Sequence, residues 1–407
     1  MPFCDVSKYQ EGGGGGTNYG IKIFYRNYGH GTTKVLLIIG LAGTHDSWGP
    51  QIKGLTGVDT PNDAESKTSS SKLNDPEEGF DSDDNEGIEV CSFDNRGMGQ
   101  TSVPTKRSEY TTTIMARDAI ALMDHLGWKN VHVFGHSMGA MIACKLAAMV
   151  PDRVLSLALL NATGGGFECF PKLDRQTISI AIRFLRAKTP EERAAVDLDT
   201  HYTKEYLDEY VGPKTRREIL YQEYVKNISS TGMQSNYGFE GQFNACWTHK
   251  MTPKELEMIR SAGFPISVIH GRHDIIAQIY YARKIAEKLQ PMARIIDLHG
   301  GHLVSHERPE EVNKALLELI KASELKLSPS DWSNLPKKDT WWQANEIQIS
   351  SSRKNYEGRF WSLFMFDIMV KFHLCLLYIF GLFMILIEYG RKALRSLKPV
   401  RVGPSIS

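Results

Sequence analysis

Three side chains in this sequence have the types and the chain order needed for nucleophilic attack on a carbonyl carbon. Ser137 lies within the run Gly135-His136-Ser137-Met138-Gly139, and Asp274 and His302 follow downstream. A serine hydroxyl is a weak nucleophile until a histidine removes its proton, and a carboxylate orients that histidine. The three residues form a candidate catalytic triad, with Ser137 as nucleophile, His302 as general base and Asp274 as orienting acid.

The glycines around Ser137 predict a sharp turn between a strand and a helix. The apolar run 131–134 precedes the turn, and an alanine-rich stretch follows it. Such a turn leaves no room for side chains at Gly135 and Gly139, and it strains the serine backbone while exposing the hydroxyl. The pentapeptide alone occurs by chance in about one chain in seven of this length. Its meaning therefore depends on what lies downstream.

Asp274 and His302 each follow a predicted strand. Residues 264–269 and 294–298 are apolar runs that indicate two neighbouring strands, and the two polar residues come a few positions after them. The carboxyl ends of parallel strands meet at one edge of a sheet, which is where open α/β sheets place their sites. The spacing therefore predicts that the acid and the histidine reach the same place.

These motifs together resemble the α/β-hydrolase fold superfamily, in its serine esterase/lipase-like branch with a helical cap, over residues 19–325. Residues 35–43 resemble the family's strand and oxyanion loop, and residues 93–101 resemble its D-x-R-G-x-G-x-S segment. The resemblance implies an α/β fold with a mostly parallel eight-stranded sheet, flanking helices and an inserted helical cap. It also implies an oxyanion hole formed by the backbone N–H groups of Leu41 and Met138.

One departure from the family lies in the oxyanion loop, where His-Gly is often found and this chain has Ile39-Gly40. The donors required there are backbone groups, so the loop can still supply them. Among the histidines, the ending Gly300-Gly301-His302 matches the family's pattern, which favours His302 over the nearby His273 and His299. His136 is expected to be a packing residue, and His45 is left unassigned.

Composition limits the other classes of function. The chain has 407 residues, a net charge of +1 and 42% hydrophobic residues, so it can form a large core but gives no reason to expect nucleic-acid binding. Its six cysteines are scattered without the spacing of a metal site or a disulfide framework. Triad chemistry needs no cofactor or metal, and none is expected. No signal-peptide core follows Met1, which predicts a cytosolic catalytic domain.

The chain divides into segments of different composition. They are, in order, a flexible N-terminal tail (1–17), the first part of the hydrolase core (18–164), the helical cap (165–251), the second part of the core (252–325), a linker (326–358), a hydrophobic membrane segment (359–390) and a basic tail (391–407). Within the first part, residues 58–87 carry ten acidic residues against two lysines, which predicts a disordered insertion. A calcium site there would need a D-x-D-x-D-G loop, which the insertion lacks.

The C-terminal hydrophobic segment predicts membrane association. Residues 372–387 carry no acidic or basic residue apart from His373. As a helix they would span about 24 Å, less than the bilayer core of about 30 Å. Five basic residues and no acidic residue follow the segment, which suits anionic headgroups. Spanning from the cytosol would put this basic tail outside, so an anchor that lies in one leaflet is an alternative to a transmembrane helix.

The sequence thus predicts a membrane-associated serine hydrolase that acts on a small-molecule acyl substrate such as a carboxylic ester, with a preference for lipophilic substrates. Two other classes stay open. One is a ligand receptor that uses the same fold, and the other is a scaffold whose triad is catalytically idle. Trapping of Ser137 by an active-site-directed reagent would support a working nucleophile, and fast turnover of short acyl esters would then disfavour the receptor.

Overall fold

Short apolar runs form a central sheet. The computed structural model describes residues 2–6, 20–65, 87–172, 174–231 and 234–335. Eight strands pair in the order β1-β2-β4-β3-β5-β6-β9-β10. Their bounds are β1 Phe3–Asp5, β2 Lys22–Tyr28, β3 Thr33–Ile38, β4 Ile88–Phe93, β5 Val131–His136, β6 Val154–Leu160, β9 Ile266–Gly271 and β10 Ala293–Leu298. All neighbours from β4 to β10 are parallel, whereas β1–β2 and β2–β4 are antiparallel. The expected mostly parallel eight-stranded sheet is confirmed.

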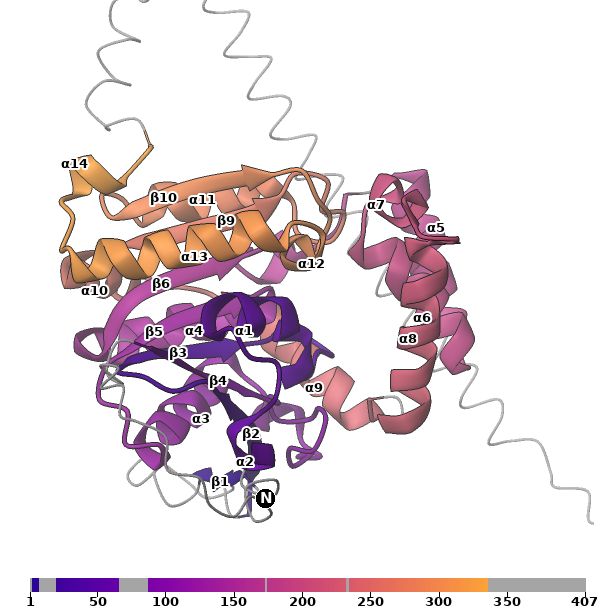
Figure 1. The fold of residues 1–407 in the computed structure, drawn as a ribbon, viewed down its shortest axis with the longest axis horizontal. Helices are drawn as coiled ribbons and strands as arrows, with labels where there is room; N and C mark the ends of the chain where they lie inside the picture. The colour runs from indigo at the N-terminus through magenta and orange to yellow at the C-terminus, as the bar shows by residue number, and fades with distance from the viewer. Residues whose placement is uncertain (1, 7–19, 66–86, 173, 232–233, 336–407) are drawn as a thin grey trace, which may run out of the picture. The chain divides into compact units, whose positions relative to one another are not determined.

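Helices cover both faces of this sheet (Figure 1). In β3, Leu36 and Ile38 pack into one apolar core while Val35 and Leu37 pack into the other, as the two-residue repeat of a strand requires. The first core is closed by α3 (Thr112–His125), α4 (Met138–Met149), α10 (Pro253–Ala262) and α11 (Ile279–Lys288). The second is closed by α1 (Gly49–Thr56), α13 (Pro309–Glu324) and α14 (Pro329–Trp332). Burial on both faces explains why the strands are continuous apolar runs.

A group of helices is inserted between β6 and β9. They are α5 (Arg175–Arg186), α6 (Pro190–His201), α7 (Lys204–Asp208), α8 (Arg216–Thr231) and α9 (Asn236–Thr248), with a small hairpin of β7 (Tyr210–Val211) and β8 (Lys214–Thr215). In Figure 1 the arrowheads of β9 and β10 point towards the side where these helices lie. Leu198, Tyr202 and Leu207 form a small core of their own, joined by Leu303 from the sheet edge. We call this group of helices the cap.

Regular structure is found within both the predicted N-terminal tail and the predicted acidic insertion. Phe3–Asp5 form β1, which pairs with β2, and Cys4 and Val6 are fully buried. The predicted flexible tail over 1–17 is therefore wrong at its start, because these apolar residues extend the sheet. In the predicted disordered insertion 58–87, Asn62–Glu65 form the short helix α2, which packs near β2 through the Arg26–Asp63 ion pair. Residues 66–86 lie outside the described residues.

The second part of the core extends past residue 325. Residues 328–335, which the sequence assigned to a linker, include α14, and Trp332 is buried with its indole N–H donated to the Ile266 carbonyl. The compact unit ends at Leu335. In the described part of the chain, no helix has both the length and the apolar character that crossing a bilayer requires. The predicted membrane segment 359–390 and basic tail 391–407 lie outside the described residues.

Candidate active site

Ser137 occupies the sharp turn between β5 and α4. Its backbone has φ 55° and ψ −117°, a combination that residues other than glycine rarely adopt. A Cβ atom at Gly135 would lie 2.3 Å from the Gly139 carbonyl oxygen, and one at Gly139 would lie 2.0 Å from the Ile38 carbonyl oxygen. Close packing of the turn against β3 therefore requires glycine at both positions. The Ser137 side chain is left partly exposed at the carboxyl edge of the sheet.

The structure brings Ser137, Asp274 and His302 together. The Ser137 Oγ lies 3.1 Å from His302 Nε2, and His302 Nδ1 lies 2.7 Å from Asp274 Oδ2. Ser137 follows β5, Asp274 follows β9 and His302 follows β10, so three strand ends supply the three groups. With Nδ1–H donated to the carboxylate, Nε2 carries the lone pair that faces the hydroxyl.

Asp274 is held as a buried carboxylate. Its oxygens accept hydrogen bonds from the Asn161 side-chain amide and from the backbone N–H groups of Ile276 and Ala277, at 2.7–2.9 Å. Burial alone raises the pKa of Asp274. The charge and hydrogen bond of His302, aided by His270 and Asn161, outweigh it and lower the pKa to about 2. The carboxylate is therefore ionised throughout the neutral range and can stabilise a cationic His302.

His136 holds the backbone of His302. Burial and the charge of His302 lower the pKa of His136 to about 3, so its ring is neutral. The Nε2–H group of this neutral ring donates to the His302 carbonyl oxygen at 2.8 Å. The two ring centroids are 4.9 Å apart in an edge-to-face arrangement. The sequence predicted only a packing role for His136, whereas the structure also gives it a hydrogen bond to the backbone of His302.

The predicted oxyanion donors lie in the loop after β3 and at the first turn of α4. Among the described residues, neither the Leu41 N–H nor the Met138 N–H has a hydrogen-bond partner. A Cβ atom at Gly40 would lie 3.0 Å from the Ser137 Cβ, so this loop runs directly beside the nucleophile. The first turn of α4 also presents the positive end of a helix dipole. Two free donors next to Ser137 suit a developing oxyanion.

The oxyanion loop is held from the core by His45. One Asp94 carboxylate oxygen accepts from both the backbone N–H and the Nδ1–H of His45, at 2.8 and 2.9 Å. Burial lowers the pKa of His45, but its hydrogen bonds to Asp46 and Asp94 outweigh burial and raise the pKa to about 9. His45, which the sequence left unassigned, therefore acts as a cation that ties the loop to the strand end at β4.

The same loop is held from the cap by Gln242. This α9 side chain is fully buried; its Oε1 accepts from the Ala42 N–H at 2.9 Å, and its Nε2 donates to the Arg96 carbonyl at 3.0 Å. Ala42 itself has a φ of 60°, an uncommon conformation that this hydrogen bond stabilises. A cap residue therefore fixes the backbone one position after the predicted donor Leu41.

Glu307 joins the cap to the loop that carries His302. Its buried carboxylate accepts from the Gly301 N–H, the Thr203 N–H and the Thr203 hydroxyl, each at 2.8 Å. From the cap side, the His201 ring stacks on the His302 ring at a centroid distance of 6.3 Å. Three acceptor contacts to one charged group are strong compared with ordinary hydrogen bonds. Glu307 therefore sets the position of the His302 loop and of the start of α7 together.

The alternative histidines do not join this arrangement. His273 and His299 are on the neighbouring loops, and their rings contact each other, with Nε2 of the first 3.1 Å from Nδ1 of the second. No group of three or more histidine, cysteine or acidic side chains among the described residues is arranged to bind a metal. The site is therefore built from the triad, its orienting partners and backbone donors.

Comparison with known proteins agrees with this geometry. A family model described as the alpha/beta hydrolase fold matches residues 34–309. The chain belongs to the α/β-hydrolase fold family. The matched range begins at β3 and ends at α13, so it contains Ser137, Asp274, His302 and the whole cap.

Relatives within the α/β-hydrolase fold family have diverse names. A Mycobacterium tuberculosis protein provisionally named non-heme bromoperoxidase BpoC is 29% identical over 237 residues, which are 58% of this chain and 83% of that protein. An Azorhizobium caulinodans protein provisionally named carbamate hydrolase RutD is 24% identical over 303 residues, covering 72% and 93%. The crystal structure of an enol-lactonase from Burkholderia xenovorans LB400 matches with a TM-score of 0.56 and 21% identity, covering 74% of this chain and 98% of that one. Membership of the family favours hydrolase activity and leaves the substrate open, while the structural match shows the shared fold.

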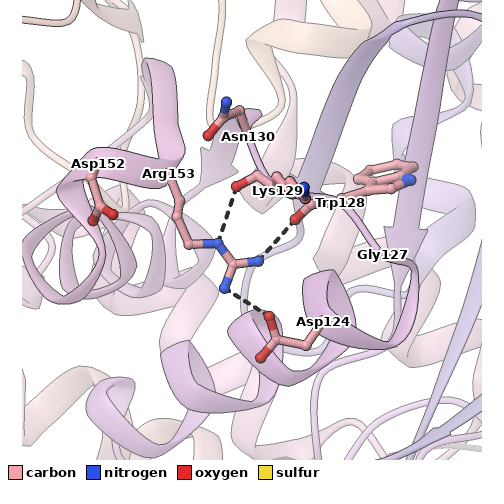
Figure 2. A pocket seen from close by; sticks show the side chains of 7 residues that line it. All are labelled: Asp124, Gly127, Trp128, Lys129, Asn130, Asp152 and Arg153. Carbon is pink, nitrogen blue, oxygen red and sulfur yellow. Dashed lines mark hydrogen bonds and ion pairs between the residues drawn. The ribbon is translucent and has the colours of Figure 1, made fainter.

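A surface hollow lies at the opposite edge of the hydrolase sheet. It has a volume of about 480 Å³ and is lined by Asp124, Gly127, Trp128, Lys129, Asn130, Asp152 and Arg153 (Figure 2). The Arg153 guanidinium donates to the Trp128 and Lys129 carbonyls and to the Asp124 carboxylate. Its residues precede β5 and β6, whereas ligand sites of such folds lie beyond the carboxyl ends of the strands. Arg153 here closes a loop.

Proposed function

We propose that this protein is a serine hydrolase that cleaves a carboxylic ester or a related acyl substrate through an acyl-enzyme on Ser137. The observation that carries the proposal is the hydrogen-bonded line from Ser137 Oγ through His302 to Asp274, with spacings of 3.1 and 2.7 Å. These spacings are within the reach that proton transfer needs. The names of two similar proteins, one provisionally named a carbamate hydrolase and the other an enol-lactonase, fit attack at an acyl carbon.

In the first half-reaction, Ser137 Oγ forms a bond to the acyl carbon while His302 Nε2 takes the hydroxyl proton. The carbonyl oxygen becomes an oxyanion, and the N–H groups of Leu41 and Met138 donate to it. Each such donor contributes about 3–4 kcal/mol to the transition state. The tetrahedral intermediate collapses, the bond to the leaving oxygen breaks, and His302 returns the proton to that oxygen. The alcohol departs and leaves an acyl ester on Ser137.

In the second half-reaction, water replaces the alcohol. His302 removes a proton from a water molecule, whose oxygen attacks the acyl carbon and forms a second oxyanion in the same place. Collapse breaks the bond to Ser137 Oγ and returns the proton to it, which releases the carboxylic acid. Asp274, ionised because its pKa is about 2, stabilises the imidazolium in both halves.

An active-site-directed fluorophosphonate tests the enzyme reading directly. We expect the intact protein to become covalently labelled, because the activated Ser137 attacks phosphorus as it attacks an acyl carbon. Ser137→Ala should abolish the label. Labelling together with turnover of short acyl esters supports a hydrolase; labelling without turnover favours a ligand receptor. An unlabelled intact protein points to an idle scaffold and overturns the proposal.

We further propose that the segment 359–390 and the basic tail 391–407 hold the catalytic unit at the cytosolic side of a membrane. Its apolar run and the positive charges after it support this. A chain ended after Leu335 keeps α14 and should pellet with membranes clearly less than the full chain, while its ester hydrolysis persists. Unchanged pelleting of that shortened chain would refute this use of the segment.

A further inference from the structure

The cap helix α5 has two apolar stripes, of which only one is packed. Thr177 and Ile180 face inward and are buried, and Phe184 contacts the ring of Phe239 on α9 at 5.9 Å. The second stripe consists of Ile178, Ile182 and Leu185, whose exposed fractions are 48%, 44% and 82%. Their spacing of four and three residues puts them along one side of the helix. We call these three residues the outer stripe.

A helix of the core shows what the outer stripe lacks. The helix α13 is also amphipathic, and its apolar residues Val312, Leu316 and Leu319 are fully buried against the sheet. Single exposed leucines are ordinary on a protein surface, but three large aliphatic side chains in register on one helix are a patch. Covering such a patch gains free energy in proportion to the apolar area removed from water.

Positive charge borders the outer stripe. At 100° per residue, Arg175 and Arg186 fall within 20° of each other and next to Ile182, at the boundary between the apolar and polar sides. Between Lys172 and Lys188 the sequence has five basic residues and one acidic residue, Asp174, whose carboxylate caps α5 through the Thr177 N–H. Within the described residues, Arg175 and Arg186 have no ion-pair partner, whereas Arg183 pairs with Asp199.

We propose that α5 is an interfacial membrane-binding helix. Its outer stripe enters the boundary between headgroups and acyl chains of an anionic membrane, and Arg175 and Arg186 contact the lipid phosphates. Branched and long aliphatic residues edged by arginine, on a short helix that lies along the surface, are the composition of such helices. An acidic or polar protein partner would not need the outer stripe, and an apolar one would not need the arginines.

The outer stripe contains no residue of the triad and none of the segment 359–390. It does not depend on the proposed reaction, because an inactive protein would bind in the same way. It adds a second membrane contact in the cap, whose residues His201 and Gln242 touch the catalytic loops. Binding through α5 would place the active-site unit at the lipid surface, where a lipophilic substrate is concentrated.

Hydrogen exchange of the full chain gives a local test. Mass spectrometry would follow peptides covering 175–186, without vesicles, with vesicles of phosphatidylcholine alone, and with vesicles that also contain phosphatidylserine. We expect slower exchange in α5 only with the anionic vesicles. Peptides covering 359–390 report separately on the other predicted contact. Equal exchange of α5 in all three conditions overturns the proposal, whatever the C-terminal segment does.

Matched substitutions in the full chain identify the contact. Ile182→Ser with Leu185→Ser should abolish the slowing in α5. The control Leu317→Ser with Leu325→Ser removes two exposed apolar residues, one in α13 and one directly after it, which are 41% and 60% exposed, and should preserve the slowing. If both pairs of substitutions preserve the slowing, or both abolish it, the outer stripe is not the contact.

Arg175 and Arg186 should make an electrostatic contribution to the binding of anionic vesicles. Arg175→Gln with Arg186→Gln should weaken binding of α5 to anionic vesicles by about fivefold for each charge removed, or about twenty-five-fold together. The control is Arg117→Gln with Lys254→Gln, two exposed cations elsewhere on the unit. Loss of binding in the control as well would mean that net charge, and not α5, directs the protein to the membrane.

Discussion

The core and the cap place side chains around Ser137 in different ways. In the core, the triad residues and Asn161 each follow a strand end, so the sheet itself sets their distances. In the cap, His201, Thr203 and Gln242 hold the same loops through a few ring and hydrogen-bond contacts. The difference indicates that the sheet defines which reaction takes place, while the cap adjusts how firmly the two catalytic loops are held. Substitutions on the two sides should therefore differ in size and kind.

The largest effect is expected for the core residues that carry the reaction. Ser137→Ala and His302→Ala should each lower kcat by about a millionfold, and the double variant should be no worse, because the two groups act as a unit. His273→Ala and His299→Ala, on the neighbouring loops, should keep near-normal rates. Steady-state hydrolysis of a short acyl ester measures this. Activity that survives His302→Ala but not His299→Ala would show that His302 is not the general base.

Removing the link between the cap and the His302 loop should have the next largest effect. Glu307→Ala leaves the buried N–H groups of Gly301 and Thr203 without acceptors, which should lower the free energy of unfolding by about 3 kcal/mol. It should also lower kcat, because the loop before His302 loses its anchor. Denaturant titration and ester kinetics measure the two effects.

A second substitution, Glu307→Gln, tests whether Glu307 acts through its hydrogen bonds or through its negative charge. Glu307→Gln retains an oxygen for both N–H groups and a donor for the Thr203 hydroxyl, so it should recover most of the stability and rate. The control Glu311→Ala removes an exposed carboxylate at the start of α13 and should have little effect. Equal losses for Glu307→Ala and Glu311→Ala would contradict the link.

The contact of His45 with Asp94, which holds the oxyanion loop to the core, should make stability depend on pH. Because the pKa of His45 is raised from 6.5 to about 9 in the folded state, its contribution to stability is complete below pH 6.5 and is lost as pH rises through 9. The Asp46 side chain is largely exposed and screened, so we expect about 2 kcal/mol. Unfolding titrations should show that the free energy of unfolding of the original chain falls by this amount, relative to that of His45→Asn, as pH rises from 6.5 through 9. Parallel pH profiles of stability for the two proteins would mean that a charged His45 does not stabilise the fold through Asp94.

The smallest effect should come from the cap contact of the same loop. Gln242→Ala frees the Ala42 N–H and should lower kcat by about tenfold with little change in KM, since it loosens the oxyanion loop and not the substrate pocket. The matched control Asn244→Ala, also on α9, removes hydrogen bonds to the Arg107 and Tyr110 carbonyls, away from the loop. Equal kcat losses in the two variants would mean that Gln242 only supports the cap.

Much of the core could be predicted because its signals are local. Most strands are short apolar runs, and the elbow glycines, Asp274 and His302 come within a few residues of strand ends that meet at one edge. The first strand was missed because three residues carry too weak a pattern, and pairing with β2 stabilises it. Likewise Trp332 lies in a polar stretch, and its burial comes from packing in the second apolar core.

The cap contacts could not be predicted for a different reason. Gln242 and Ala42 are 200 residues apart, and an isolated glutamine on a helix has no sequence signal for its partner. Glu307 stands before a helix as an ordinary surface acid would, and its burial depends on where Thr203 arrives. For Asn161, a polar residue ending an apolar strand was a usable signal, since Asp274 lies on the adjacent strand end.

The most direct test of the account is to trap the acyl-enzyme. The protein is mixed with a short acyl ester, quenched in acid during turnover, digested, and analysed by mass spectrometry for an acyl group on the peptide that contains Ser137. We predict that this adduct accumulates in the original chain and in Glu307→Gln, and that it is absent from Ser137→Ala. Sustained ester hydrolysis without any adduct on Ser137, or an adduct on another residue, would contradict the central claim.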